Sequence, residues 1–109
     1  MLLMKKEFFD AIRRGRKTTT LRYWRWLHIR AGSVHTVRGL GKVRIEAAHE
    51  IAPADLTDAD ARADGFADLA SLHRTLQEIY PPTKREGRKL YQIRFTYLPG
   101  PDLEAAGAS

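Results

Sequence analysis

Residues 15–23 have the sequence GRKTTTLRY and join two segments whose apolar residues repeat with different periods. The apolar side chains of Met4, Phe8, Ala11 and Ile12 recur at the spacing of one helix face. Gly15 is suited to end that helix because glycine adopts a positive φ without strain. The β-branched and aromatic residues of 18–23 favour a strand. The stretch therefore predicts a helix that stops at a glycine and leads directly into a β-strand.

The remaining chain predicts further strands around a helical insert. Besides the strand at 18–23, strands are expected at Val34–Arg38, Val43–Ile51 and Tyr91–Tyr97, the last from an alternation typical of a half-buried antiparallel strand. In the insert, Thr57 can cap a helix that Gly65 ends, and leucines at helical spacing predict a second helix over 69–80. Thr83–Arg88 is expected to be a basic loop. Without a repeated βαβ unit, this order predicts an α+β fold with a small, curved, mainly antiparallel sheet.

The length and composition indicate one small domain. Of the 109 residues, 1–98 are expected to form the domain, and 99–109, which are rich in Pro, Gly and Ala, a flexible C-terminal tail. The chain has no cysteine, which excludes disulfides, thiolate zinc sites and a thiol nucleophile. No apolar run has the length of a signal-peptide core or a membrane span, so we expect a cytoplasmic domain without membrane contact.

The net charge of +6 is unevenly distributed along the chain. Residues 1–44 carry twelve basic and two acidic side chains, residues 45–80 carry two and eight, and residues 81–109 carry five and three. Thirteen of the nineteen basic residues are arginine, whose planar guanidinium pairs with phosphates and stacks on rings. This charge distribution favours a nucleic acid or nucleotide as partner, and a solvated basic surface is the alternative.

The motif GRKTTTLR places three cations and three hydroxyls within eight residues. Strand alternation puts Thr18, Thr20 and Arg22 on one face, and Thr19 and Leu21 on the other. Leu21 is then the expected core residue. The polar face either lies open to solvent or forms the floor of a cleft, and composition alone favours the open strand.

This arrangement resembles the opening signature of the ASCH (activating-signal cointegrator homology) family, in which a glycine, lysine, threonine and arginine motif follows an amphipathic helix. The residues that carry the resemblance are Phe8, Ile12, Gly15, Lys17, Thr18, Thr20 and Arg22. The stretch from Asp55 to Tyr80 and the strand Tyr91–Phe95 also resemble small bacterial members, so that residues 4–98 are covered. The resemblance implies a PUA-like fold, a small β-barrel of mainly antiparallel strands with flanking helices, and a cleft that accepts nucleic acid or a modified base.

Some small bacterial ASCH proteins are amidohydrolases that remove the acetyl group from N4-acetylcytidine. The resemblance implies that Lys17, Thr20 and Asp64 stand at the positions of their lysine, second threonine and acid. A desolvated lysine beside Arg16 or Arg22 would have a lowered pKa and could activate the Thr20 hydroxyl or a water, while the acid moves a proton to the leaving amine. The acid in these enzymes is usually glutamate, so Asp64 is one methylene shorter.

The segment Tyr23-Trp24-Arg25-Trp26 directly follows the motif. Rings interleaved with arginine are typical of a platform for single strands, because any base stacks on a ring while cations follow the phosphates. The alternative is that one tryptophan closes the core and the other packs against an arginine stem.

We therefore expect a nucleic-acid-binding domain, for RNA or a single strand, built on a basic cleft at the motif. The residues expected to bind are Arg16, Lys17, Thr18, Arg22, Trp24, Arg25 and Trp26. The alternatives are an amidohydrolase acting on N4-acetylcytidine-type modified nucleosides and a protein-interaction module whose basic face meets an acidic partner. The four histidines lack metal-ligand spacing, so neither a metal nor a cofactor is expected.

Overall fold

The structure is a computed structural model in which residue 2 and residues 4–100 are described, so most of the expected tail lies outside the described residues. The elements in chain order are η1 (Lys6–Phe8), α1 (Phe9–Arg13), β1 (Thr19–Trp24), β2 (Val34–Val37), β3 (Gly41–Glu50), η2 (Pro53–Asp55), α2 (Asp58–Ala63), α3 (Leu69–Ile79), α4 (Pro82–Arg85) and β4 (Lys89–Leu98). No helix in the described part of the chain is long and apolar enough to cross a membrane.

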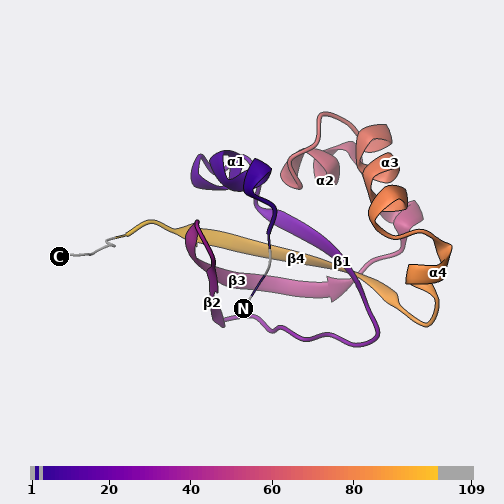
Figure 1. The fold of residues 1–109 in the computed structure, drawn as a ribbon, viewed down its shortest axis with the longest axis horizontal. Coiled ribbons are helices and arrows are strands. Elements are labelled where there is room, and N and C mark those ends of the chain that lie inside the picture. Colours follow the sequence, from indigo (N-terminus) through magenta and orange to yellow (C-terminus); the bar gives the residue numbers. More distant parts are fainter. Residues whose placement is uncertain (1, 3, 101–109) are drawn as a thin grey trace.

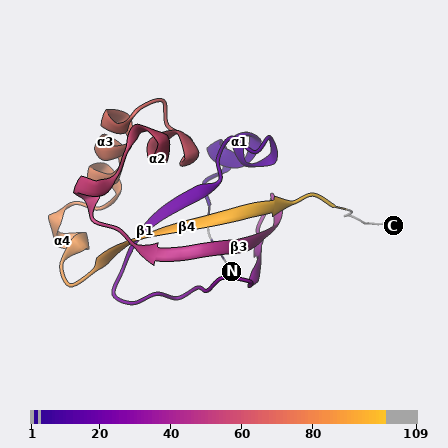
Figure 2. The same cartoon turned by 180° about the vertical axis from the view of Figure 1, so that it is seen from behind.

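The strands form one antiparallel sheet in the order β1-β4-β3-β2, which curls into half of a barrel (Figure 1). The predicted α+β fold with a small curved sheet and flanking helices is confirmed. Helices α1, α2 and α3 gather along the β1 side of the sheet, and a long connection from β1 to β2 runs past its opposite side, as both views show (Figures 1 and 2). β1 is therefore an edge strand that lies next to the helices.

Two hydrophobic clusters cover the two faces of the sheet. On one face, Phe9 and Ile12 of α1 pack with core residues of β3 and β4 such as Ile45 and Ile93. On the other face, Leu21 packs in a second cluster that also holds residues of α2 and α3. β1 runs between these clusters, so its successive side chains enter different cores. Leu21 is buried as expected.

β4 is half-buried from Ile93 to Thr96, as its alternation predicts, but Gln92 departs from the pattern. The insert covers one end of the face that was expected to be open, whereas Arg94 and Thr96 on the same face are exposed. Gln92 is consequently buried, and its side-chain amide donates to Asp60 Oδ1 at 3.0 Å. The alternating pattern does not predict that the insert covers Gln92, because a glutamine at a polar position of a strand is usually exposed.

Two local predictions also need correction. The expected basic loop Thr83–Arg88 begins inside a short helix, α4, which Pro82 opens and which is followed by Gly87 at φ +70°. In the N-terminal helix, Phe9 is buried, whereas Ala11 is only partly so. The reason is that the first turn is 3-10 rather than α, which changes the angle between successive side chains.

Candidate functional site

A cleft of about 380 Å³ opens along the edge of β1. Residues 4–8 form one wall, and residues of α3 together with Tyr80 form the other. The floor contains Lys17, Thr20 and Arg22 of the motif, with Asp64 of the insert. Residues from four separate parts of the chain therefore meet at this cleft.

Backbone hydrogen bonds fix the entry of the motif into the cleft. Gly15 has a φ of +75°, and the two following backbone N–H groups donate to Ala11 O. Thr18 N donates to Ala63 O at 2.7 Å, which ties the start of β1 to the end of α2. The predicted glycine stop thus delivers Lys17 to the C-terminal end of α2.

Lys17 is buried, with 4% of its surface exposed. Its ammonium donates to the backbone oxygens of Thr19, at 2.9 Å, and of Asp64, and lies 3.5 Å from Asp64 Oδ2. The same nitrogen lies 4.6 Å from the ring centroid of Phe8. Lys17 is therefore surrounded by two carbonyls, a carboxylate and a ring face, all of which favour a cation.

Asp64 follows the last residue of α2 and is also buried. Its Oδ1 accepts from the Thr19 hydroxyl at 2.9 Å. The next residue, Gly65, has a φ of +97°, and a Cβ there would lie 3.4 Å from Lys17 Cδ. The positive φ therefore favours glycine at this turn, and an added Cβ would only be in van der Waals contact with the lysine stem.

Burial moves the pKa values of this pair in opposite directions. It lowers the pKa of Lys17, and the neighbouring Arg22 adds to that effect while Asp64 opposes it. Burial raises the pKa of Asp64, against the attraction of Lys17 and the hydrogen bond from Thr19. Each group is thus shifted towards its neutral form, as is common in sites that move protons.

Thr20 and Arg22 face the other side of β1. The Arg22 Nε donates to the Thr20 hydroxyl at 3.0 Å, and its Nη2 lies 3.9 Å from the sulfur of Met4. Burial lowers the pKa of Arg22, but an arginine stays protonated in proteins. Of the two neighbouring hydroxyls, it is that of Thr19 and not that of Thr20 that contacts Asp64. Sequence reasoning missed Thr19, although alternation along β1 already separated the two threonines.

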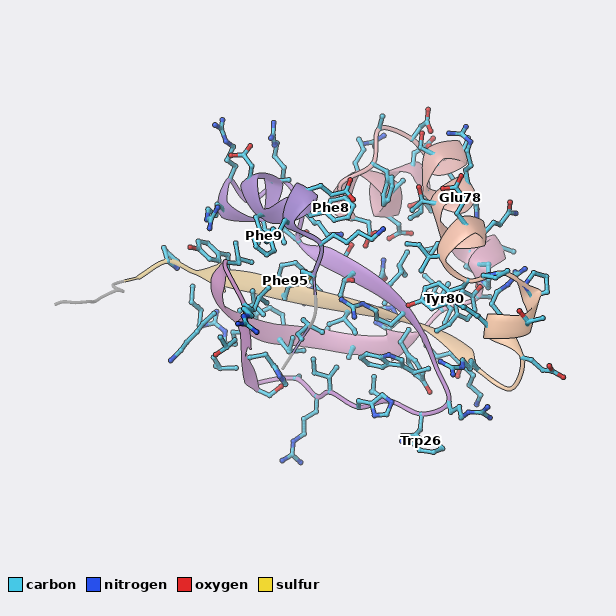
Figure 3. All side chains as sticks on the ribbon, viewed as in Figure 1. Phe8, Phe9, Trp26, Glu78, Tyr80 and Phe95 are labelled. Carbon is cyan, nitrogen blue, oxygen red and sulfur yellow. The ribbon has the colours of Figure 1, made fainter. Side chains whose placement is uncertain are left out.

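The structure brings together only part of the expected binding residues. Trp24, Arg25 and Trp26 do not line the cleft. Arg16 and Thr18 do not line the cleft either. Arg16 is exposed, and its Nη2 lies 3.4 Å from Asp10 Oδ2. The backbone N–H and C=O of Thr18 both form backbone hydrogen bonds. The strand carries the tryptophans away from the motif, and Figure 3 shows Trp26 on the opposite side of the molecule from Phe8.

The two tryptophans nevertheless form a separate aromatic segment. Trp24 is half-buried, and its ring lies 4.8 Å from that of His28 and 6.4 Å from that of Tyr91. Trp26 is 64% exposed, with its ring 6.1 Å from that of His28. Of the two predicted roles, Trp24 therefore packs against the core, and Trp26 presents its face to solvent.

Sequence reasoning did not predict the aromatic walls of the cleft. Phe8 and Phe66 meet edge to face with centroids 5.9 Å apart, and Tyr80 packs against Tyr23 at 5.1 Å. Phe8, Phe66 and Tyr80 all line the cleft. Within residues 2 and 4–100, no group of three acidic or histidine side chains is placed to hold a metal ion.

Solved structures share this fold. The hypothetical protein PH0355 aligns with a TM-score of 0.74 and 14% identity over 88% of this chain and 95% of that one. An ASCH domain from Lactobacillus crispatus aligns with a TM-score of 0.68 and 18% identity over 81% of this chain and 68% of that one. A protein from Pyrococcus furiosus aligns with a TM-score of 0.60 and 16% identity over 86% and 92%, respectively. No protein-family model matches the chain, and no curated protein matches its sequence significantly. The resemblance to ASCH domains is thus confirmed in the fold.

Proposed function

We propose that this chain, which has the fold of an ASCH domain, binds RNA or another single-stranded nucleic acid and takes one base into the cleft along β1. The observation that carries the proposal is the composition of that cleft, in which Arg22 and Lys17 lie among the rings of Phe8, Phe66 and Tyr80. Rings beside cations suit a base and its phosphate. A volume of about 380 Å³ falls at the small end of the roughly 300–1,000 Å³ usual for ligand pockets.

The aromatic segment supports a longer ligand. Arg22 and Trp24 lie on the same face of β1, roughly 7 Å apart along the strand. Beyond them, the exposed ring of Trp26 follows Arg25. A strand with one base in the cleft can therefore continue past Arg22 towards a second ring, while the basic residues of 1–44 attract its phosphates.

The test is fluorescence anisotropy of labelled single-stranded RNA and DNA octamers at increasing salt. We expect the logarithm of affinity to fall linearly with the logarithm of salt concentration. Arg22→Gln should weaken binding and reduce the slope by about one if the guanidinium contacts a phosphate. Arg94→Gln, which is exposed on β4 and outside the cleft, is the matched control. Affinity that does not change with salt, or equal loss in both variants, would contradict the proposal.

Trp26→Ala tests the aromatic segment separately. Stacking of one base is worth about 1–3 kcal/mol, so affinity for the octamer should fall by roughly five- to 150-fold. Val34→Ala, which truncates another exposed apolar side chain, should leave affinity unchanged. If Trp26→Ala binds like the wild type, the aromatic segment takes no part in binding.

The buried pair favours a second candidate, hydrolysis of N4-acetylcytidine to cytidine and acetate. Lys17 and Asp64 have pKa values shifted towards their neutral forms, and they share the cleft with Thr20. In this reaction Lys17 takes the proton of the Thr20 hydroxyl or of a water, that oxygen attacks the acetyl carbon, and Asp64 protonates the departing amine. If Thr20 is the nucleophile, a water then hydrolyses the acetyl-threonine ester and releases acetate. Incubation with N4-acetylcytidine and mass spectrometry of the product would test this. Thr20→Val, which keeps the side-chain shape, should abolish turnover, and unchanged turnover in this variant would exclude the hydroxyl from the reaction.

A further inference from the structure

We propose that the cleft binds an unpaired base by its Watson–Crick edge, through the backbone N–H and C=O of Leu21. This inference rests on the proposed function and adds which edge of the base is recognised and by which group. It follows from the unpaired edge of β1, from the position of the cleft on that edge, and from the hydrogen bond by which Lys17 occupies Thr19 O at one end of the edge.

The register of β1 against β4 determines which peptide groups are free. Phe95 N donates to Thr18 O at 2.9 Å, so this pair is hydrogen-bonded across the two strands. In an antiparallel ladder such pairs alternate, so that Thr20 with Ile93 and Arg22 with Tyr91 are also hydrogen-bonded pairs. The N–H and C=O groups of Thr19, Leu21 and Tyr23 consequently point away from β4.

The hydrogen bond of Lys17 agrees with this assignment. Its ammonium donates to Thr19 O, which it reaches because that carbonyl points out of the sheet. Two residues further along, the Leu21 carbonyl and amide point in the same direction. Among the described residues, no side chain or loop backbone forms a hydrogen bond with them.

The cleft lies on this edge. Thr20, Leu21 and Arg22 all line it, although the side chain of Leu21 lies on the opposite face of the sheet from the other two. A cavity that touches both faces of an edge strand lies across its edge, where the outward peptide groups are. The side chain of Leu21 is anchored in the core under α3, which holds its backbone in place.

The closed end of the edge favours a base over a peptide strand. An added β-strand needs a run of free peptide groups, but Lys17 already occupies Thr19 O. The outward pair of Leu21 offers one donor beside one acceptor. The Watson–Crick edge of every base presents a donor and an acceptor side by side, and proteins bind unstacked bases of single strands on this edge.

A pair of isomeric ligands tests this inference. Hexamers of N3-methyluridine and of 5-methyluridine carry the same number of methyl groups, but only the first blocks the Watson–Crick edge. In anisotropy titrations, the N3-methyl hexamers should bind at least about tenfold more weakly than the unmodified ones because two hydrogen bonds are lost, and the 5-methyl hexamers should bind within about twofold.

A backbone substitution tests the protein side. Replacement of residue 21 by leucic acid converts the Thr20–Leu21 amide to an ester, which removes the Leu21 N–H and weakens the Thr20 carbonyl as an acceptor. We expect unmodified hexamers to bind this variant about three- to tenfold more weakly and the discrimination against N3-methylation to shrink. The same ester at Tyr23, whose N–H is also outward but which does not line the cleft, should leave binding unchanged. Salt-dependent binding in which N3-methyl and 5-methyl hexamers are equivalent would overturn the inference and leave the proposed function intact, whereas failure of every octamer and hexamer to bind would overturn both.

Discussion

Asp60 in the first turn of helix α2 and Asp64 directly after its last residue have entirely different surroundings. Asp60 lies in the first turn, where it accepts from Thr57 N at 2.9 Å and from Gln92 at 3.0 Å. The hydrogen bond from Gln92 is the main reason that the pKa of Asp60 is lowered. Asp64 lies at the other end of the helix, where burial raises its pKa despite the nearby Lys17.

The contrast between the two sites indicates which carboxylate stabilises the folded state and which one destabilises it. An acid in the first turn interacts favourably with the helix dipole and completes a capping box with Thr57. An acid at the C-terminal end has the opposite relation to the dipole, and a buried ion pair often stabilises less than apolar residues would. Asp60 thus stabilises helix α2, whereas the buried charge of Asp64 in the cleft does not.

The largest effect is expected from breaking the buried pair. Lys17→Met leaves the Asp64 carboxylate buried without its cation and should lower the free energy of unfolding by about 3–5 kcal/mol. Adding Asp64→Asn should restore much of this loss, because no unpaired charge remains. Urea unfolding of the single and double variants gives both values.

An exposed ion pair is the control for this prediction. Arg14 and Asp10 are 67% and 66% exposed in their side chains and 3.0 Å apart, so Arg14→Met should cost less than about 1 kcal/mol. A Lys17→Met variant no less stable than Arg14→Met would show that the buried pair contributes nothing special to the fold.

Two threonines provide a matched comparison of intermediate size. Thr19→Val removes the hydroxyl that donates to the buried Asp64 and should cost about 1.5–3 kcal/mol, as is usual for a hydrogen bond to a charged group. Thr57→Val removes the cap that accepts from Asp60 N and should cost about 1 kcal/mol. Thermal or urea unfolding would rank the two, and the reverse order would mean that the cap matters more than the site.

The smallest expected effect is on the pH dependence of the free energy of unfolding, where Asp60 and Asp64 should contribute with opposite signs. The native pKa of Asp60 is lowered, so its stabilising contribution exists at neutral pH and is lost as pH falls through its unfolded and then its native pKa. The native pKa of Asp64 is raised, so the native state binds this proton more tightly, and a fall in pH through that value favours folding.

Asparagine variants separate the two contributions because asparagine does not titrate. Between pH 7 and pH 3.5, the stability advantage of the wild type over Asp60→Asn should shrink. Over the same range, the stability of the wild type relative to Asp64→Asn should rise. Urea unfolding at several pH values measures both differences, and a common sign would contradict the opposite shifts.

The two ends of α2 also show what sequence can predict. Thr57, three residues before Asp60, is a local signal, and the capping box follows from it. Gly65 as the end of the helix is equally local. The contact between Lys17 and Asp64 joins residues 47 positions apart, and only the resemblance to ASCH domains placed them in one site.

Other features of the site depend on tertiary packing. The aromatic walls of the cleft come from η1, from the turn after α2 and from the end of α3, and no spacing in the sequence relates Phe8 to Phe66 or Tyr80. The aromatic segment was expected to belong to the cleft because it follows the motif directly. A strand extends by about 3.3 Å per residue, so four residues are enough to carry Trp26 away from it.

The central place of β4 has a consequence for how the domain is made. β4 is the last element of the described residues, yet β1 and β3 both pair with it, and Thr19 lies opposite Arg94. During synthesis, neither β1 nor β3 can pair with β4 until nearly the whole domain has left the ribosome. Folding therefore requires contacts between residues far apart in the sequence, which makes it slower. β1 has no strand partner until β4 is inserted between β1 and β3. The cleft along β1 therefore forms only after β4 has paired with that strand.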